Sequence, residues 1–202
     1  MSASFIVFEG LDGSGKTTQA RALFRRLRQQ GHPVLLTREP GGTALGESLR
    51  RWLKRQGGLS PLSELFLFVA ARAQFVKEIV RPNLEAGVNV IGDRYIASTI
   101  AYQGYGRGLD LALVEQLNQA ATGGLRPNLT VLLDLPEVDA LARKRHHTSD
   151  VFETAPMEFH CRVRNGYLTQ AGQDPDGWLV LDGGRPVGGL SRQIWAKIQP
   201  LL

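Results

Sequence analysis

The sequence predicts an α/β fold: a five-stranded parallel sheet with helices on both faces, in a single domain that spans residues 1–202. Five short apolar runs typical of strands alternate with stretches of helical periodicity; these runs are residues 5–8, 34–36, 88–91, 129–133 and 178–181. Because the runs are continuously apolar and not alternating, we expect strands that are buried on both faces, as in parallel sheets. A chain of 202 residues with 43% hydrophobic composition is long enough to bury such a core.

The first apolar run leads into the most informative segment of the chain. Residues 10–17 read Gly-Leu-Asp-Gly-Ser-Gly-Lys-Thr and fit the phosphate-binding pattern G-x-x-x-x-G-K-[ST], with a strand before it and an amphipathic helix after it. Glycines allow backbone N–H groups to surround a phosphate, and a helix N-terminus favours the anion. Lys16 would reach the β- and γ-phosphates and Thr17 would contact Mg²⁺. The alternative is a glycine-rich turn without a ligand. The predicted nucleotide-binding residues are Gly10, Leu11, Asp12, Gly13, Ser14, Gly15, Lys16, Thr17 and Thr18.

Three later helix boundaries carry local signals. The first helix should end at Gly31, because glycine favours helix termination. Ser60 before Pro61 predicts an N-cap followed by a first-turn proline. Another helix should begin after Asp110 and end at residues 123–124, which are both glycine.

Charged residues follow three of the predicted strands. Arg38 and Glu39 follow the second, Asp93 and Arg94 the third, and Asp134 the fourth. Ligands of open parallel sheets bind beyond the carboxyl ends of the strands, so these residues suit Mg²⁺ and a second anionic ligand. The alternative is that they form surface ion pairs or helix caps, and for Asp134 both interpretations stay open.

The helix that starts at Pro61 places Leu65, Phe68 and Arg72 on one face. If this face lines a cleft, Phe68 can stack on a base while Arg72 donates to a carbonyl of that base. The spacing alone favours the alternative, in which Phe68 belongs to the core and Arg72 extends to water.

Taken together, these segments resemble the thymidylate kinase family, in particular its bacterial form. The resemblance covers nearly the whole chain and depends on residues 10–18 (GLDGSGKTT), 37–43 (TREPGGT), 67–74 (LFVAARAQ), 93–95 (DRY) with 101–104 (AYQG), and 132–136 (LLDLP). It implies transfer of the γ-phosphoryl group of ATP to dTMP, giving ADP and dTDP. It also implies a homodimer of the P-loop NTPase fold with a mobile lid at about residues 142–153.

The resemblance assigns roles to individual residues. Asp12 would lie near the 3′-hydroxyl and phosphate of the acceptor, and Arg94 would hold that phosphate, supported by Asp93 and by the loop of Arg38 and Glu39. Phe68 would stack on thymine, Arg72 would bind its O4, and Thr99 would lie near the base. Tyr102 would pack against the sugar C2′ and disfavour ribonucleotides. Gln103 is the remaining predicted substrate-binding residue, and the predicted Mg²⁺ site consists of Thr17, Asp93 and Glu153.

Residues 142–147 form a basic run where the lid of the family begins. The P-loop carries no arginine at its variable positions, so the resemblance implies a catalytic lid arginine, Arg143 or Arg145, which would act with Lys16, Asp12 and Arg94. Residues 150–153 read Asp-Val-Phe-Glu where family members commonly have Asp-Arg-Phe-Glu. This departure leaves the choice of arginine open, and the run can instead be a solvated basic face.

Composition limits the other possibilities. The 24 basic and 19 acidic residues give a net charge of +5, which suits a nucleotide substrate and would also suit nucleic acid; the family resemblance favours dTMP and no nucleic acid. The only cysteine, Cys161, cannot form an internal disulfide, and no apolar run approaches ~20 residues, so we expect a cytoplasmic enzyme without a membrane segment. The residues His146, His147, His160 and Cys161 lack zinc-site spacing.

Two other functions are weighed against this one. Another P-loop nucleoside monophosphate kinase would keep Lys16 and Thr17 without the thymine-reading helix, whereas a GTPase would need Asn-Lys-x-Asp, and no asparagine here precedes a lysine. A nucleotide sensor or nucleic-acid binder without catalysis is opposed by the intact Lys16, Thr17 and Arg94.

Overall fold

The computed structural model describes residues 3–55, 58–144, 152 and 155–202. Its strands are β1 (Phe5–Glu9), β2 (Val34–Arg38), β3 (Asn89–Asp93), β4 (Leu129–Asp134) and β5 (Trp178–Asp182). They form one parallel sheet in the order β2-β3-β1-β4-β5. The predicted five-stranded parallel sheet is therefore confirmed.

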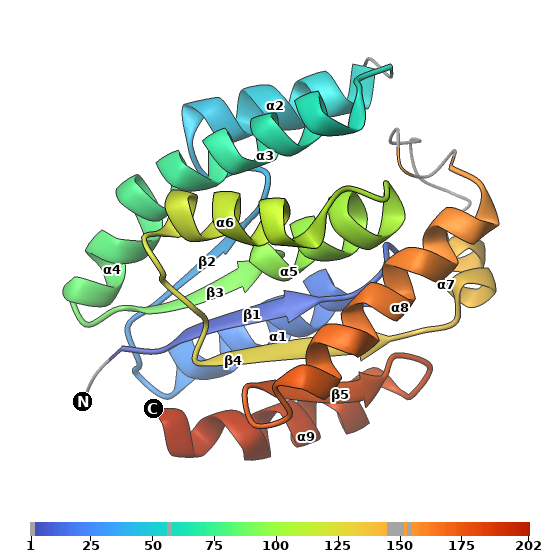
Figure 1. The fold of residues 1–202 in the computed structure, drawn as a ribbon. Helices are drawn as coiled ribbons and strands as arrows, with labels where there is room; N and C mark the ends of the chain where they lie inside the picture. Colours follow the sequence, from blue (N-terminus) through green and yellow to red (C-terminus); the bar gives the residue numbers. More distant parts are fainter. Residues whose placement is uncertain (1–2, 56–57, 145–151, 153–154) are drawn as a thin grey trace.

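Helices enclose the sheet from both sides. They are α1 (Lys16–Gln29), α2 (Ala44–Arg55), α3 (Pro61–Phe75), α4 (Arg81–Glu85), α5 (Ile96–Thr99), α6 (Leu111–Thr122), α7 (Glu137–Lys144), α8 (Met157–Gln173) and α9 (Val187–Ile198). The wider turns η1 (Val76–Val80) and η2 (Ile100–Gly106) prolong α3 and α5, and the short η3 (Gln199–Leu201) follows α9. α1 and α9 lie on one side of the sheet, whereas α3, α6 and α8 lie on the other (Figure 1).

The predicted helix boundaries are confirmed by their capping geometry. Ser60 Oγ accepts a hydrogen bond from the Ser63 N–H at 3.2 Å, and the Asp110 carboxylate accepts one from the Ala112 N–H at 2.9 Å. Gly123 ends α6 in the left-handed conformation, with φ of 56°. Short polar contacts of this kind are local, which is why the sequence predicts them well.

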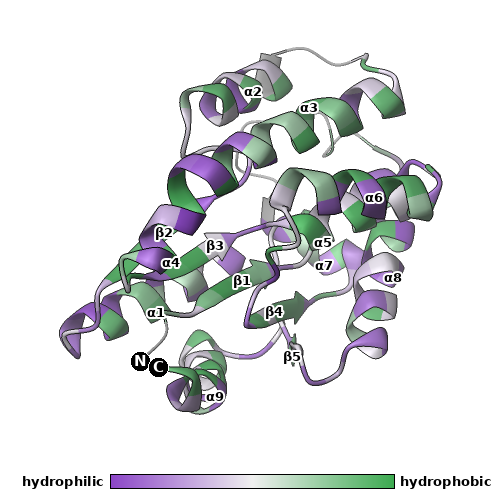
Figure 2. Ribbon diagram, turned by 60° about the vertical axis from the view of Figure 1, so that its left-hand side comes forward, coloured by the Kyte–Doolittle hydropathy of each residue, from purple (hydrophilic) through white to green (hydrophobic). Residues whose placement is uncertain are grey.

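The central strands carry the core. Every residue of β1 is buried, and the apolar side chains of β1, β3 and β4 pack against helices on both faces; Figure 2 shows these strands in hydrophobic colours between the helices. The edge strands β2 and β5 are mostly half-buried, so the prediction of full burial is wrong for them. They lie at the margins of the helical layers, where less surface is covered. Among the described residues, no helix combines the length and apolar character that crossing a bilayer requires.

The strand register determines which loops meet. β1 pairs with β3 so that Phe8 lies opposite Asp93, and the Arg94 N–H donates to the Phe8 carbonyl at 3.0 Å. The loop after β1 and the loop after β3 therefore leave the sheet side by side at its carboxyl edge, which is where ligands of this fold class bind.

Candidate active site

The loop after β1 has the geometry of a phosphate cradle. α1 begins at Lys16, directly after Gly15 in a left-handed conformation. A Cβ atom on Gly13 would lie 2.3 Å from the Ala140 carbonyl oxygen, and one on Gly10 would lie 2.5 Å from that of Leu133. Both positions therefore require glycine. The first N–H groups of a helix have no partner within it, so this helix start can bind an anion.

Lys16 is buried beside this loop. Its Nζ donates to the Leu11 carbonyl at 2.8 Å and lies 3.8 Å from Asp12 Oδ1. Burial, followed by the positive charge of Arg94, lowers the pKa of Lys16, and Asp12, Asp93 and Glu9 act in the opposite direction; the net result is a pKa of about 8. An arriving polyphosphate would raise this pKa, because it stabilises the ammonium form.

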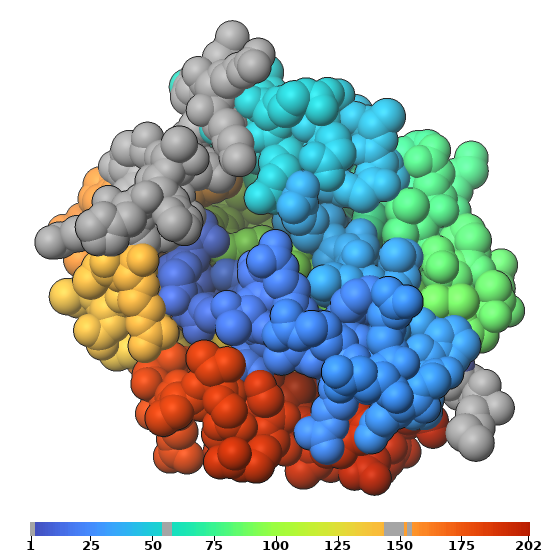
Figure 3. Space-filling view, turned by 180° about the vertical axis from the view of Figure 1, so that it is seen from behind, coloured from blue at the N-terminus to red at the C-terminus, as the bar shows by residue number. Residues whose placement is uncertain are grey.

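A cavity of about 570 Å³ opens at the carboxyl edge of the sheet. Figure 3 shows a hollow between the blue N-terminal residues and the cyan α2. The cavity brings together most of the predicted site: Asp12, Gly13, Gly15, Lys16, Thr17, Thr18, Arg38, Glu39, Phe68, Arg72, Asp93, Arg94, Thr99, Tyr102, Gln103 and Arg143. Three predicted nucleotide-binding residues, Gly10, Leu11 and Ser14, are buried and do not line it.

Four side chains hold the guanidinium of Arg94 in this cavity. Its Nη2 donates to Asp12 Oδ1 at 2.7 Å and to the Tyr102 hydroxyl at 3.2 Å, while Nη1 contacts the hydroxyls of Ser98 and Tyr167. Burial by itself would lower the pKa of Arg94, but Tyr102, Asp12, Tyr167 and Glu9 together raise it well above its usual value. Arg94 is therefore a permanent, oriented positive charge.

The residues that hold Arg94 differ from those expected from the sequence, which were Asp93 and the loop of Arg38 and Glu39. Asp93 Oδ2 accepts from the Thr17 hydroxyl at 2.5 Å, and Glu39 pairs with Arg72. Neither carboxylate bonds to Arg94 in the structure. Its partners come instead from the P-loop and from the helices after β3 and before β5.

Arg72 is almost completely buried, with 1% of its surface exposed. Its Nε donates to Glu39 Oε2 at 2.8 Å, and Nη2 donates to the Tyr95 carbonyl at 3.1 Å. Nη1 donates to the Thr99 hydroxyl at 2.8 Å and to Asn118 Oδ1 at 2.6 Å. The alternative in which Arg72 extends to water is therefore wrong, because a buried guanidinium must fill its donors within the protein.

Aromatic side chains form the apolar part of the cavity. Phe68 is half-buried, and its ring centroid lies 6.2 Å from that of Phe152. Tyr102 lies 5.3 Å from Phe152 on the same centroid measure, and burial raises its pKa, so its hydroxyl stays protonated. Gln103 donates to Glu64 Oε1 at 2.8 Å, which fixes its amide beside these rings. The cavity thus has a charged end and an aromatic end.

The hydroxyl of Thr17 and the carboxylate of Asp93 are the described oxygen ligands that fit Mg²⁺. The ion prefers few protein ligands and completes its shell with water and phosphate oxygens. No group of three histidine, cysteine, aspartate or glutamate side chains in the described part of the chain could hold a metal ion. The third predicted metal ligand, Glu153, lies outside the described residues.

Asp134 does not line the cavity. Its two carboxylate oxygens accept from Arg164 Nε and Nη2 at 2.7 and 2.9 Å. Of the two interpretations left open for Asp134, the surface ion pair is the one observed.

Only part of the predicted lid falls within the described residues. Arg143 Nη1 donates to the Gly183 carbonyl at 2.9 Å and lines the cavity. Arg145 and most of the predicted lid, residues 142–153, lie outside the described ranges.

Sequence reasoning missed several residues of the site. Arg21, Arg50, Ser98 and Phe152 also line the cavity, and the side chains of Glu9, Asn118 and Tyr167 hold its arginines in place directly or through a hydroxyl. For Glu9 a signal was available: it is a charged residue at the end of an otherwise apolar strand. Asn118 and Tyr167 lie on distant helices and gave no local signal.

The comparisons with known proteins agree with this geometry. The family model of thymidylate kinase matches residues 8–194. The chain belongs to the thymidylate kinase family. It is 48% identical to a thymidylate kinase of Desulforudis audaxviator over 100% of this chain and 93% of that protein, and 49% identical to one of Deinococcus radiodurans over 96% and 95%. The crystal structure of thymidylate kinase from Ehrlichia chaffeensis superposes with a TM-score of 0.83 at 37% identity, covering 98% of this chain and 99% of that one.

Proposed function

We propose that this chain transfers the γ-phosphoryl group of ATP to dTMP and forms ADP and dTDP. The observation that carries the proposal is the position of Lys16 and Arg94 in one cavity, where both lie within 3.8 Å of the Asp12 carboxylate. Lys16 belongs to the P-loop and suits the donor triphosphate. Arg94 supplies a second cation for the phosphate of the acceptor. Family membership identifies dTMP as that acceptor.

The chemistry requires little beyond positioning. The attacking atom is a phosphate oxygen of dTMP, which is ionised near neutral pH, so no strong general base is needed. Catalysis then depends on alignment of the two phosphates and on stabilisation of charge that develops during transfer. The buried, oriented Lys16 and Arg94 suit this task, because fixed charges need no reorganisation during the reaction.

The aromatic end of the cavity suits a nucleoside. We propose that Phe68 stacks on thymine and that Tyr102 packs against the sugar at C2′. Arg72 would bind thymine O4 by giving up one of its present acceptors, Thr99 or Asn118, because all three of its nitrogens are engaged. The buried ion pair with Glu39 would keep its guanidinium plane fixed during this exchange.

Thr17 and Asp93 would hold Mg²⁺ at the donor phosphates. When bound, the ion would neutralise charge on the β- and γ-phosphates. Among the proposed lid residues, Arg143 is described and faces the same cavity, and Arg145 and Glu153 remain proposals from the resemblance alone.

We further propose that the protein is a homodimer, with the outer face of α3 as its contact. Leu62, Phe66 and Leu67 of α3 and Leu113 of the adjoining α6 are exposed, and Phe66 leaves 51% of its surface uncovered. Figure 2 gives hydrophobic colouring along both helices. Clustered exposed apolar side chains of this kind typically form interfaces. The substitution Phe66→Asp should convert a dimer into a monomer in analytical ultracentrifugation, and a monomeric wild-type protein would contradict the proposal.

Compartment and partners follow from the proposed substrate. We expect a cytoplasmic enzyme that acts on free nucleotides and needs no nucleic acid, consistent with its single cysteine.

The test is product analysis. Incubation with ATP, Mg²⁺ and dTMP should convert dTMP to dTDP, detected by ³¹P NMR and anion-exchange chromatography. Lys16→Ala should reduce the rate at least ~100-fold with an unchanged melting temperature. Absence of dTDP with the wild-type protein would refute the proposed function.

A further inference from the structure

Glu9 is the last residue of β1 and precedes the P-loop directly. Its exposed surface is 0%, although it carries a carboxylate. A buried carboxylate is costly unless donors surround it. Burial raises the pKa of Glu9, and Arg94, Ser98, Tyr95 and Tyr167 oppose that rise. Arg94 is itself one of these four residues, Tyr95 follows it in the chain, and the hydroxyls of Ser98 and Tyr167 accept hydrogen bonds from its guanidinium.

One oxygen of Glu9 holds the backbone that follows Arg94. Oε1 accepts hydrogen bonds from the Tyr95 N–H at 2.8 Å and from the Ser98 N–H at 3.2 Å. Arg94 itself has φ of 76°, a left-handed conformation that is unfavourable for a residue with a side chain. The contact at Tyr95 fixes the chain immediately after this strained residue.

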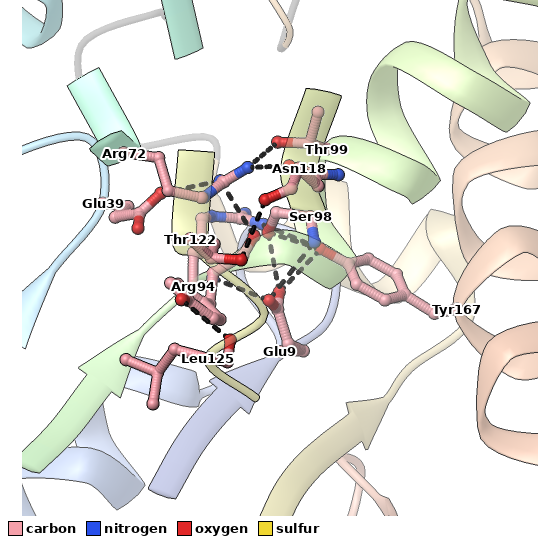
Figure 4. Close-up of polar contacts among 11 residues, drawn as sticks. Glu9, Glu39, Arg72, Arg94, Ser98, Thr99, Asn118, Thr122, Leu125 and Tyr167 are labelled. Atoms are coloured by element: carbon pink, nitrogen blue, oxygen red, sulfur yellow. Dashed lines mark hydrogen bonds and ion pairs between the residues drawn. The ribbon is translucent and has the colours of Figure 1, made fainter. Parts of the chain in front are cut away.

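The other oxygen of Glu9 acts on the side chain of Arg94 through two hydroxyls. Oε2 accepts from the Ser98 hydroxyl at 2.6 Å and from the Tyr167 hydroxyl at 3.0 Å. The same two hydroxyl oxygens accept from Arg94 Nη1 at 3.0 and 3.1 Å. Figure 4 shows Glu9, Ser98 and Tyr167 converging beside Arg94, with Tyr167 reaching in from another helix.

This arrangement keeps the outer edge of the guanidinium, Nη2, outside the Glu9 network and facing the cavity. A direct ion pair with Glu9 would turn the guanidinium of Arg94 toward β1 and away from the cavity. With hydroxyls between the charges, only Nη1 is used, while Nη2 lies at the cavity with Asp12 and the Tyr102 hydroxyl. Guanidinium N–H groups can donate to both hydroxyls, and each hydroxyl can donate to the carboxylate. The two hydroxyl oxygens also lie 2.8 Å apart, so either can donate to the other instead.

We propose that Glu9 is a positioning residue for phosphoryl transfer, acting through Ser98 and Tyr167 to orient the Arg94 guanidinium toward the acceptor phosphate. The inference rests on the proposed function, in which Arg94 binds that phosphate. A small misplacement of such a group can cost about 10²-fold in rate. A carboxylate that only stabilises the core would instead affect folding and leave the kinetics intact.

Tyr167→Phe tests the proposal, because it removes one hydroxyl and keeps the ring. The matched control is Tyr95→Phe, which removes another buried tyrosine hydroxyl, one that donates to the Leu125 carbonyl and not to this network. We expect kcat/KM for dTMP to fall about 5- to 30-fold in Tyr167→Phe, with the KM for ATP unchanged and a loss of melting temperature no greater than in the control. Ser98→Ala should act in the same direction, and Glu9→Gln should reduce kcat/KM about 100-fold if it folds.

The decisive comparison repeats Tyr167→Phe in an Arg94→Ala background. If Tyr167 acts through Arg94, its effect on kcat/KM disappears there. An effect of equal size in both backgrounds, or wild-type kinetics of Tyr167→Phe with a lowered melting temperature, would overturn the proposal. Failure of the proposed function is distinguishable, since the wild-type protein would then form no dTDP at all. An acceptor found in its place would serve in the same comparison.

Discussion

Arg94 and Asp12 form an ion pair of 2.7 Å between the loops that follow β3 and β1. The same Asp12 oxygen lies 3.8 Å from Lys16 Nζ. One carboxylate thus lies between the two cations that we assign to the donor and acceptor phosphates, and it reduces their mutual repulsion before either nucleotide arrives. The consequences can be tested separately for donor, base, sugar and metal.

Affinity for ATP should decrease above about pH 8. The pKa of Lys16 in the free protein is about 8, and the triphosphate favours the charged ammonium. Below this pH the proton is already present, so affinity is constant; above it, binding must take up a proton, and affinity falls by up to about tenfold per pH unit. Calorimetric titrations from pH 7 to 9.5 measure this. Lys16→Ala should bind weakly and without this pH dependence, and a flat wild-type profile would contradict the prediction.

Arg72→Ala should weaken dTMP binding by ~1.5–3 kcal/mol and leave ATP binding nearly unchanged, because a thymine carbonyl loses a charged donor. The same change leaves Glu39 buried without its partner, which should cost ~3–5 kcal/mol of stability. Adding Glu39→Gln removes the isolated charge and should restore much of the stability without restoring dTMP binding. If the concentrations of dTMP and of ATP that half-saturate the variant rose by the same factor, Arg72 would have a structural role only.

These expectations show where the sequence was informative. The P-loop, the five strands and the helix caps depend on residues within a few positions of one another, and local pattern predicts them. The Glu9–Tyr167 contact joins residues 158 positions apart, and the Arg72–Asn118 contact joins α3 to α6. Such pairs depend on helix packing over the sheet, which no local pattern encodes.

For Arg72, the family resemblance implied a position in the binding cleft that the local pattern did not indicate. Spacing alone favoured an arginine that reaches water, because an isolated helix offers no partner for a buried guanidinium. The partners come from the loop after β2, from the chain after β3 and from α6. Burial of this residue is a property of the assembled fold.

Tyr102→Ala should relax the selection of deoxyribose. A ring packed against C2′ would have to move to admit a hydroxyl, at a cost of ~1–3 kcal/mol, about ten- to two-hundred-fold in discrimination. Tyr102→Phe is the matched control: it loses the 3.2 Å contact with Arg94 but keeps the ring and should keep the selectivity. The ratio of kcat/KM for dTMP and its ribonucleotide counterpart measures the effect. An unchanged ratio in Tyr102→Ala would show that the Tyr102 ring does not select deoxyribose.

Asp93→Asn should raise the Mg²⁺ concentration required for half-maximal activity, because the substitution removes the charged oxygen beside Thr17. Asp134→Asn provides the comparison, since Asp134 ends another strand of the sheet, β4, but pairs with Arg164. It should leave the Mg²⁺ dependence unchanged and cost at most ~1 kcal/mol of stability. Identical Mg²⁺ curves for both variants would argue against a metal site at Asp93.

The central claim, a kinase whose cavity selects dTMP, is tested most directly by ADP release with five acceptors at equal concentration: dTMP, dUMP, UMP, dCMP and AMP, each with ATP and Mg²⁺. We predict the highest kcat/KM for dTMP, the lowest values for dCMP and AMP, and a dTMP activity that is at least ~100-fold lower, but still measurable, in Arg94→Ala. A preference for AMP or dCMP, or full dTMP activity in Arg94→Ala, would contradict the account.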